Sequence, residues 1–424
     1  MKQPQISILS MIAISTCTVF LAGCKSSSPD NSVKKLEQLQ KNPMQGKRPT
    51  PTEIGNSAEN TKTIKIGLIA PESGPLSPWG IEIYRGAKMA VESFNKNNSI
   101  RGKKIELLVG DSASRPDQGK TAAEKHIANG AIGLVGDLSS GITAAIAQSA
   151  FEKGIPLLTV GGTNPAITDI GSNIYRICYT DDIQGPVMAK FAYEELNVRK
   201  AAIFTDRKEP YSVGLSKGFR KKFEELGGEI IDEQFYEAGQ TQFNAQLTNL
   251  KMKHPEALYL CGYYPEVGPI ARQAANFKIK AHCLGGDGWD TDDILTSGGK
   301  AILGGFHTTH YNIFEKRPVI NNFINKWKET YGYHPKTVPS ALTYDAFKLL
   351  IDCLQRCKKL DSQSLTKALE ETENFDGVTG NIGFKNMNGN PRKGAVVVKV
   401  TPSGRILQKS YSYDSIIETN KVSS

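Results

Sequence analysis

The chain has 424 residues, of which 39% are hydrophobic and 22% are charged, and its formal net charge at pH 7 is +9. These values exclude a disordered chain and a bundle of membrane helices, and the length suits two domains of ordinary size. The excess of Lys and Arg does not indicate nucleic-acid binding, because acidic residues lie between the basic ones and no basic stripe carries aromatic side chains.

The first residues have the features of a secretion signal. Met1 and Lys2 give a short positive start, and the apolar run from Ile6 to Leu21 falls short of a comfortable membrane span of roughly 20 residues. The run ends in Leu21-Ala22-Gly23-Cys24, which resembles a bacterial lipobox and implies cleavage before Cys24 and lipid on that residue. An uncleaved membrane anchor is the alternative. Both interpretations predict a signal over residues 1–23 and a body outside the cytoplasmic membrane, without indicating which membrane holds the anchor.

Residues 24–62 differ in composition from the rest of the chain. They are rich in Ser, Pro, Asn, Gln, Lys and Glu and contain almost no aromatic residue, so they bury too little apolar surface to offset chain entropy. We predict a flexible tether there.

After the tether, short apolar runs alternate with segments of helical periodicity. A strand is expected at 63–70 and a helix from Ile81 to Phe94, and a second set begins with a strand at 201–205. Further strands are expected at 104–110, 132–136, 155–160, 229–236, 257–262 and 281–285, and further helices at 118–129, 143–153, 212–226, 243–253 and 267–277. This alternation predicts an α/β fold with two Rossmann-like lobes, each with a parallel central sheet.

Ligands bind such sheets beyond the carboxyl ends of the strands, so the loops at these ends predict the site. In the first set these loops are rich in Gly, Ser and Thr and open helices, whose N–H groups bind anions. In the second set they carry aromatic residues and one carboxylate. The candidate ligand-binding residues are Trp79, Ser140, Gly161, Gly162, Thr163, Tyr211, Tyr263 and Asp287.

Neutral donors on one lobe and a carboxylate on the other fit a zwitterion with a carboxylate and an ammonium group. Asp287 would pair with the ammonium, because a charge taken out of water needs a partner of opposite sign. Ser140 and Thr163, with the N–H groups near Gly161 and Gly162, would hold the carboxylate. The three aromatic residues would surround the rest of the ligand.

Each of these residues also has an ordinary structural role. Ser140 and Thr163 are of the types that cap helices, and Asp287 can cap a segment or stabilise a turn. Trp79, Tyr211 and Tyr263 can belong to the lobe cores or to the surface.

Several runs, in unbroken order from about Thr63 to Tyr413, resemble the periplasmic leucine/isoleucine/valine-binding protein family. They are Ser73-Gly74-Pro75 with Gly80 and Gly86-Ala87, Leu138-Ser139-Ser140 with Thr143, Gly161-Gly162-Thr163, Tyr263-Tyr264-Pro265-Glu266-Val267-Gly268 with Ala271-Arg272-Gln273, and Gly286-Asp287-Gly288. Proteins of this family are substrate-binding components of ABC importers, with a type I two-lobe fold that closes on its ligand at a hinge.

The resemblance implies roles for individual residues. The carboxylate-binding serine of the family falls on Ser140, with further contacts on Gly161 and Thr163, and the ammonium partner falls on Asp287. The family's first-loop aromatic residue falls on Trp79 and its cleft tyrosines fall on Tyr211 and Tyr263. Three features depart from the family pattern: Trp79 replaces a tyrosine, Asp287 is shorter than the glutamate of leucine-binding members, and Ser139 stands where some members have a cysteine of a disulfide.

The resemblance also implies the domain boundaries. Three crossings between the lobes are expected near 180–184, 308–311 and 375–380. The N-terminal lobe would contain residues 63–180 and 312–375, the C-terminal lobe residues 184–307 and 381–416, and the tail residues 417–424.

Features of enzymes and metal sites are weak in this sequence. The G-x-S-x-G string at 214–218 lies inside a helical pattern rather than at a strand–turn–helix junction. His307 and His310 have a spacing that points them to opposite faces of a strand. Cys353 and Cys357 share a helix face without further ligands, and the five body cysteines are an odd number, so we expect buried free thiols.

The sequence therefore predicts a lipid-anchored, extracytoplasmic binding protein and not an enzyme. We expect a monomer, without cofactor or metal, that captures a branched-chain or other neutral amino acid and delivers it to the permease of an ABC importer. A binding protein for an amide or an aromatic acid, and a sensor that presents its closed form to a signalling partner, are the alternatives.

Overall fold

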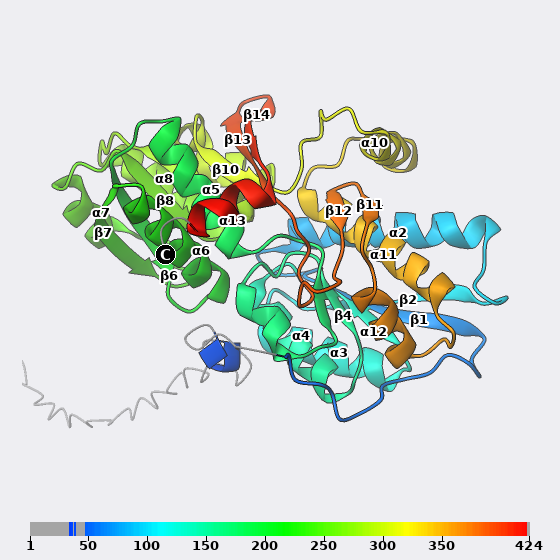
Figure 1. Cartoon of the computed structure of the whole chain (residues 1–424). Coiled ribbons are helices and arrows are strands. Elements are labelled where there is room, and N and C mark those ends of the chain that lie inside the picture. The colour runs from blue at the N-terminus through cyan, green and yellow to red at the C-terminus, as the bar shows by residue number, and fades with distance from the viewer. Residues whose placement is uncertain (1–33, 37, 40–46, 422–424) are drawn as a thin grey trace, which may run out of the picture.

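The computed structural model describes residues 34–36, 38–39 and 47–421. It contains two lobes, and the chain crosses between them several times (Figure 1). The predicted signal and Cys24 lie outside the described residues. No helix in the described part of the chain is long and apolar enough to cross a membrane.

The N-terminal lobe contains a five-stranded sheet in which all strands are parallel, with the order β2-β1-β3-β4-β5. Its strands are β1 (Thr63–Ala70), β2 (Lys104–Asp111), β3 (Gly133–Val135), β4 (Leu157–Thr159) and β5 (Ile174–Arg176). The helices of this lobe are α2 (Ser77–Asn97), α3 (Pro116–Ala128), α4 (Ser140–Glu152), η1 (Pro165–Ile170), α10 (Pro318–Tyr331), α11 (Val338–Arg356) and α12 (Ser362–Glu370).

The C-terminal lobe repeats this strand order and extends it by an antiparallel hairpin, giving β14-β13-β10-β9-β8-β6-β7. Its strands are β6 (Lys200–Asp206), β7 (Glu229–Tyr236), β8 (Ala257–Cys261), β9 (His282–Gly285), β10 (Phe306–Thr309), β13 (Ala395–Thr401) and β14 (Gly404–Tyr411). Its helices are α5 (Asp181–Glu194), α6 (Pro210–Glu225), α7 (Asn244–Lys251), α8 (Tyr264–Asn276), η2 (Asp287–Trp289), α9 (Asp293–Gly298), η3 (Gly299–Ile302) and α13 (Tyr413–Lys421). The predicted α/β fold with two parallel-sheet lobes is confirmed.

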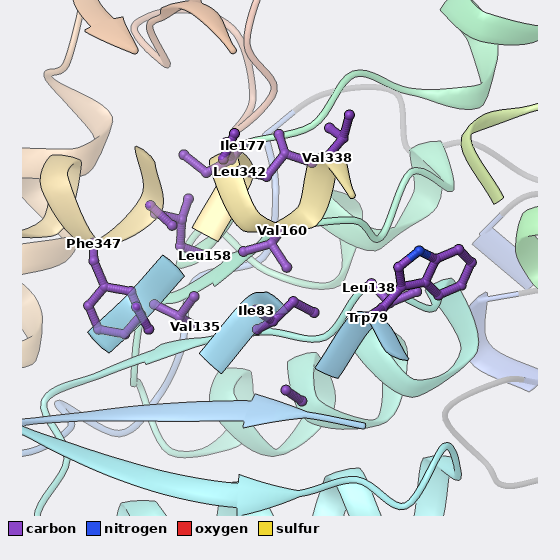
Figure 2. Packing of buried hydrophobic residues seen from close by; sticks show 14 of the residues in the cluster. Trp79, Ile83, Val135, Leu138, Leu158, Val160, Ile177, Val338, Leu342 and Phe347 are labelled. Atoms are coloured by element: carbon purple, nitrogen blue, oxygen red, sulfur yellow. The ribbon is translucent and has the colours of Figure 1, made fainter. Parts of the chain in front are cut away.

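Helices cover both faces of the N-terminal sheet, because its short strands are apolar on both sides. On one face, α2 and α11 pack against each other although they are far apart in the sequence. Figure 2 shows Val338 and Leu342 of α11 at the top of the view and Ile83 of α2 below them, beside Val135 at the end of β3, with Trp79 of α2 further to the right. The start of α11 is thereby held at the edge of the lobe that faces the C-terminal lobe.

A hairpin of the N-terminal lobe, before the last crossing between the lobes, is held by a buried carboxylate. Asp345 of α11 accepts hydrogen bonds from the backbone N–H groups of Val378 and Thr379, both 2.8 Å away. These residues connect β11 (Phe375–Gly377) to β12 (Gly380–Ile382). Lys393 Nζ donates to Thr379 Oγ1 at 2.6 Å, so chain segments on both sides of the crossing are joined.

The expectation of a flexible tether as far as residue 62 is wrong for its C-terminal part. Residues 47–62, here called the strap, lie against the N-terminal lobe. Arg48 is 8% exposed and donates to the carbonyl oxygens of Gly171 and Ile174 at 3.1 and 2.6 Å, and Asn56 Nδ2 donates to that of Ala131 at 2.9 Å. Composition missed this because the strap is fixed by polar side chains that bond backbone carbonyls, not by an apolar face.

The cysteines of the body are free thiols, as expected. Cys178, Cys261, Cys353 and Cys357 are buried and Cys283 is half-buried. Among the residues that the structure describes, no three His, Cys, Asp or Glu side chains gather in a way that would hold a metal ion. The G-x-S-x-G string at 214–218 lies inside α6, as the helical pattern predicted.

Candidate ligand-binding site

A cavity lies between the lobes. It is placed at the carboxyl ends of β1, β3, β6 and β8, where the strand order reverses in each sheet, which is the usual ligand position in such folds. Its walls come from both lobes and from the start of α11. The lining residues are Trp79, Leu138, Gly161, Tyr211, Tyr263, Asp287, Gly288, Asp290, His310, Val338, Pro339 and Leu342.

The N-terminal lobe supplies an apolar wall. Leu138 lies in the loop after β3, and Val338, Pro339 and Leu342 belong to the first turns of α11. Pro is suited to this position because the first residues of a helix have no N–H bond to lose. Figure 2 shows Leu138 and Trp79 close together on the side where Val338 begins α11.

Trp79 joins this wall to the C-terminal lobe. Its side chain is only 1% exposed, and its ring makes edge-to-face contacts with Tyr263 and Tyr264 at centroid distances of 5.7 and 5.1 Å. The indole Nε1 donates to the carbonyl oxygen of Asp290, 3.1 Å away. The Tyr264 hydroxyl donates in turn to the carbonyl oxygen of Pro75 in the N-terminal lobe. These contacts between lobes identify the structure as a closed form.

The C-terminal lobe supplies a polar wall centred on Asp287. Its Oδ1 accepts from Gln184 Nε2 at 3.0 Å, and its Oδ2 lies 2.9 Å from His310 Nε2. The His310 ring is stacked on Tyr179 with a centroid distance of 3.8 Å, and burial lowers its pKa. A neutral imidazole therefore donates one hydrogen bond to Asp287 and leaves its negative charge uncompensated.

A second carboxylate lies beside this one. Gln184 Nε2 also donates to Asp181 Oδ1, at 2.9 Å, so one amide bridges Asp181 and Asp287. Asp181 is fully buried, and this burial raises its pKa well above the ordinary value. Asp181 Oδ2 and Thr163 Oγ1 are buried without a hydrogen-bond partner in the described part of the chain. Asp287 lines the cavity and these two side chains do not, so the carboxylate of Asp287 is the acceptor that this end of the site offers to an N–H donor of a ligand.

The loops expected to hold an anion are arranged differently from the expectation. Gly161 N–H donates to the Asp137 carbonyl oxygen at 3.4 Å and Gly162 N–H donates to Thr159 Oγ1 at 3.0 Å, so both are used within the lobe. Ser139, not Ser140, caps α4, with its Oγ accepting from Ile142 N–H at 3.4 Å. That these two glycine N–H groups bind the ligand carboxylate stays a prediction, although Gly161 lines the cavity.

A buried cation supports the same loop from within the lobe. Arg176, at the end of β5, is fully buried. It donates to the carbonyl oxygens of Gly162, Asn164 and Pro165 at 2.6, 2.9 and 3.1 Å. Ser140 Oγ accepts from the N–H of Asn164 at 3.2 Å, so the loop is fixed against both β5 and α4. The positive charge of Arg176 lies beneath the side of the site where the ligand carboxylate is expected.

The cleft tyrosines are stacked on each other. Tyr211 and Tyr263 have a centroid distance of 4.9 Å, and the Tyr211 hydroxyl accepts from the N–H of Gly288 at 2.9 Å. Tyr211 thereby fixes the backbone next to Asp287, and Tyr263 presents its ring to the cavity.

The structure brings most of the predicted residues together. Trp79, Gly161, Tyr211, Tyr263 and Asp287 line the cavity, whereas Ser140, Gly162 and Thr163 are fully or nearly buried in the adjoining loops. Sequence reasoning missed nine residues. Leu138 follows a strand, Asp181 and Gln184 lie in the first turn of a helix, and Gly288 and Asp290 are close to Asp287, so these positions carried a signal. His310 and the α11 residues Val338, Pro339 and Leu342 are contributed by segments distant in sequence.

Comparisons with known proteins agree with this geometry. The family model described as periplasmic binding protein matches residues 63–405. The Leu/Ile/Val-binding protein homolog 1 of Brucella suis biovar 1 is 30% identical over 322 residues, which cover 76% of this chain and 86% of the relative.

Two solved structures are similar over most of the chain. The leucine binding protein LivK of Thermotoga maritima has a TM-score of 0.78 and 33% identity, covering 83% of this chain and 99% of that one. LivJ of Streptococcus pneumoniae, a branched-chain amino acid transporter substrate binding protein in complex with isoleucine, has a TM-score of 0.77 and 27% identity, with the same coverage. This chain therefore belongs to the periplasmic binding proteins, as an extracytoplasmic substrate-binding protein with the type I fold and not an enzyme.

Proposed function

We propose that this protein captures a neutral aliphatic amino acid between its lobes and delivers it to the permease of an ABC importer. The observation that carries the proposal is the polarity of the cavity. Leu138, Val338 and Leu342 form an apolar wall on one lobe, and Asp287 presents an uncompensated carboxylate on the other. A free amino acid with an aliphatic side chain matches both walls, because its ammonium pairs with the acid and its side chain fills the apolar part.

The relatives support the same ligand class. LivJ of Streptococcus pneumoniae was solved with isoleucine, and the Brucella suis relative is described as a Leu/Ile/Val-binding protein homolog. A ligand without an ammonium group would leave the Asp287 carboxylate without a partner of opposite charge, which is costly in a buried site. The amide and aromatic-acid alternatives are therefore disfavoured by this side chain.

Calorimetric titration of the purified full-length protein, stripped of carried-over ligand by partial unfolding and refolding, tests this proposal. We expect L-leucine, L-isoleucine and L-valine to bind, and L-aspartate and benzoate not to bind. Asp287→Asn keeps the shape of the side chain but removes its charge. It should weaken leucine binding at least about 100-fold, since removing one partner of a buried charge pair costs roughly 3–5 kcal/mol.

Asp292→Asn is the matched control, because that carboxylate lies five residues further on, is mostly exposed and is not among the lining residues. Leucine affinity should be unchanged in this variant. Binding of none of the amino acids, or equal binding by wild type and Asp287→Asn, would contradict the proposal.

We also propose that Cys24 carries the lipid that holds the protein at a membrane. The support is the sequence Leu21-Ala22-Gly23-Cys24 at the end of a short apolar run. Mass spectrometry of protein from the membrane fraction should find a mature N-terminus at Cys24 with acyl chains attached. Release of wild-type protein from membranes by salt alone would argue against a covalent anchor.

A further inference from the structure

Glu209 is a carboxylate of the C-terminal lobe that reaches across to the N-terminal lobe. It is the N-cap residue of α6, and its Oε1 accepts a hydrogen bond from the backbone N–H of Gly141, 3.1 Å away, in the first turn of α4. A Cβ built on Gly141 would lie only 3.0 Å from Glu209 Oε2. Glycine at this position therefore lets the carboxylate approach the helix start.

Tyr263 completes the contact from the side of the cavity. Its hydroxyl donates to the same oxygen of Glu209, 3.3 Å away, while its ring lines the cavity and contacts Trp79. The lining residues include neither Glu209 nor Gly141. Glu209 therefore does not line the cavity itself. It is hydrogen bonded to Tyr263, which does, and to Gly141 of the opposite lobe.

This contact exists only when the lobes are together. The first N–H groups of a helix have no partner within the helix, and the positive end of the helix favours an acceptor. Separation of the lobes returns Gly141 N–H and Glu209 to water, so the contact stabilises the closed form and contributes nothing to the open form. A substitution that destabilises only the closed form lowers the equilibrium constant for closure. It lowers the apparent ligand affinity by the same factor.

We propose that Glu209 is a positioning residue that latches the closed form by accepting hydrogen bonds from Gly141 and Tyr263. The inference rests on the proposed function, because the latch acts on the ligand that the closed form encloses. It predicts an effect on how long the ligand stays, not on which side chain is accepted. The competing role is that Glu209 occupies the helix start that the ligand carboxylate needs next to Ser140, and removing Glu209 would then tighten binding.

Stopped-flow fluorescence with the full-length protein separates these roles. In Glu209→Ala we expect the dissociation rate of L-leucine to rise about tenfold and the association rate to change less than about twofold, as for the loss of one or two hydrogen bonds. The dissociation rates of L-isoleucine and L-valine should rise by the same factor. Glu209→Gln keeps an acceptor oxygen and should restore most of the residence time.

Glu237→Ala is the control, since Glu237 lies on the same lobe, is exposed and pairs with Lys208 at 2.7 Å. It should behave as wild type. Unchanged or tighter binding in Glu209→Ala, or a loss that differs between the three amino acids, would overturn the latch.

A second measurement needs no ligand. The ligand-free Glu209→Ala variant should have a larger radius of gyration in solution scattering than ligand-free wild type, because its closed form is less populated. Equal radii would overturn the latch. If wild type binds none of the three amino acids, the proposed function fails while the scattering comparison still decides whether Glu209 holds the lobes together.

Discussion

Arg176 is a fully buried cation whose hydrogen bonds go to backbone carbonyls rather than to a carboxylate. Replacing it by methionine leaves the carbonyl oxygens of Gly162, Asn164 and Pro165 without this donor. Arg176→Met should lower the free energy of unfolding by about 3–5 kcal/mol, as is typical when a buried polar network is broken. Urea denaturation checks this value. Arg207→Met, at an exposed site on the opposite lobe, should cost less than about 0.5 kcal/mol.

Glu209 also predicts how ligand binding depends on pH. Burial between the lobes, reinforced by the carboxylate of Asp206, raises the pKa of Glu209 to about 7 in the closed form. When the lobes separate, the carboxyl group faces water, so we expect its pKa to fall back toward the ordinary value. The closed form therefore binds a proton that the open form releases, and closure becomes more favourable as the pH falls from 8 to 6. A protonated carboxyl group still accepts from Gly141 through its carbonyl oxygen.

Leucine affinity should accordingly rise by up to about tenfold between pH 8 and pH 6. Tyr211 and Tyr263, which also face Glu209, have pKa values raised far above this range by burial, so they stay protonated throughout. Glu209→Gln removes this titration from the protein and also relieves the repulsion that Glu209 exerts on the Asp206 carboxylate. Calorimetry of both proteins across the pH range tests this prediction, and a slope that persists in Glu209→Gln would assign the effect to another group.

At the scale of elements, the first turns of α11 set the size of the apolar wall. Leu342 lines the cavity and is 1% exposed. Leu342→Ala should weaken leucine binding about 10- to 100-fold, the range for lost methylene contacts in a pocket, and should raise the affinity for L-phenylalanine relative to L-leucine. Leu354→Ala, on the same helix but away from the cavity, should destabilise the protein without changing this ratio. Competition between the two amino acids in a binding assay measures the ratio.

The elements also show what a sequence can predict here. Strand and helix periodicity located β1 to β4 and β6 to β9, since their apolar runs are bounded by Gly, Pro and polar residues. The same rule placed Tyr211, Tyr263 and Asp287 at the ends of strands, where the cavity lies. The site's acidic end was therefore predictable in position.

Contacts made by distant segments were not predictable. Val338 and Leu342 come to the cavity because α11 packs on α2, and His310 comes because the chain crosses between the lobes after β10. Neither segment carries a local pattern that distinguishes a cavity wall from a lobe core. The N-cap of α4 shows the same limit. Ser139 and Ser140 are equally suitable as cap residues, and the sequence does not show that the helix begins at Ser140 and is capped by Ser139.

At the scale of the whole molecule, the lobes are joined by a few contacts that the open form must break. Three of these contacts are hydrogen bonds to backbone carbonyl oxygens that connect one lobe to the other. They run from Trp79 Nε1 to Asp290, from the Tyr264 hydroxyl to Pro75 and from Asn164 Nδ2 to Pro210. Saturating L-leucine should therefore reduce the radius of gyration of the wild-type protein in solution scattering, because the ligand adds contacts to both lobes only when they are closed. L-aspartate, which does not match the apolar wall, should leave the radius unchanged. An equal radius with and without leucine would show that closure does not depend on the ligand.

The strap has a mechanical consequence for a protein held at a membrane. Because residues 47–62 are fixed on the N-terminal lobe, and Leu36 is buried among its residues, a lipid at Cys24 would hold the molecule through that lobe and not through the C-terminal lobe. The N-terminal lobe would then be the stationary part of the molecule. The C-terminal lobe, with Asp287 and Glu209, would be the part that swings as ligand enters and leaves, so the open or closed state would be visible mainly as the angle of one lobe above the membrane.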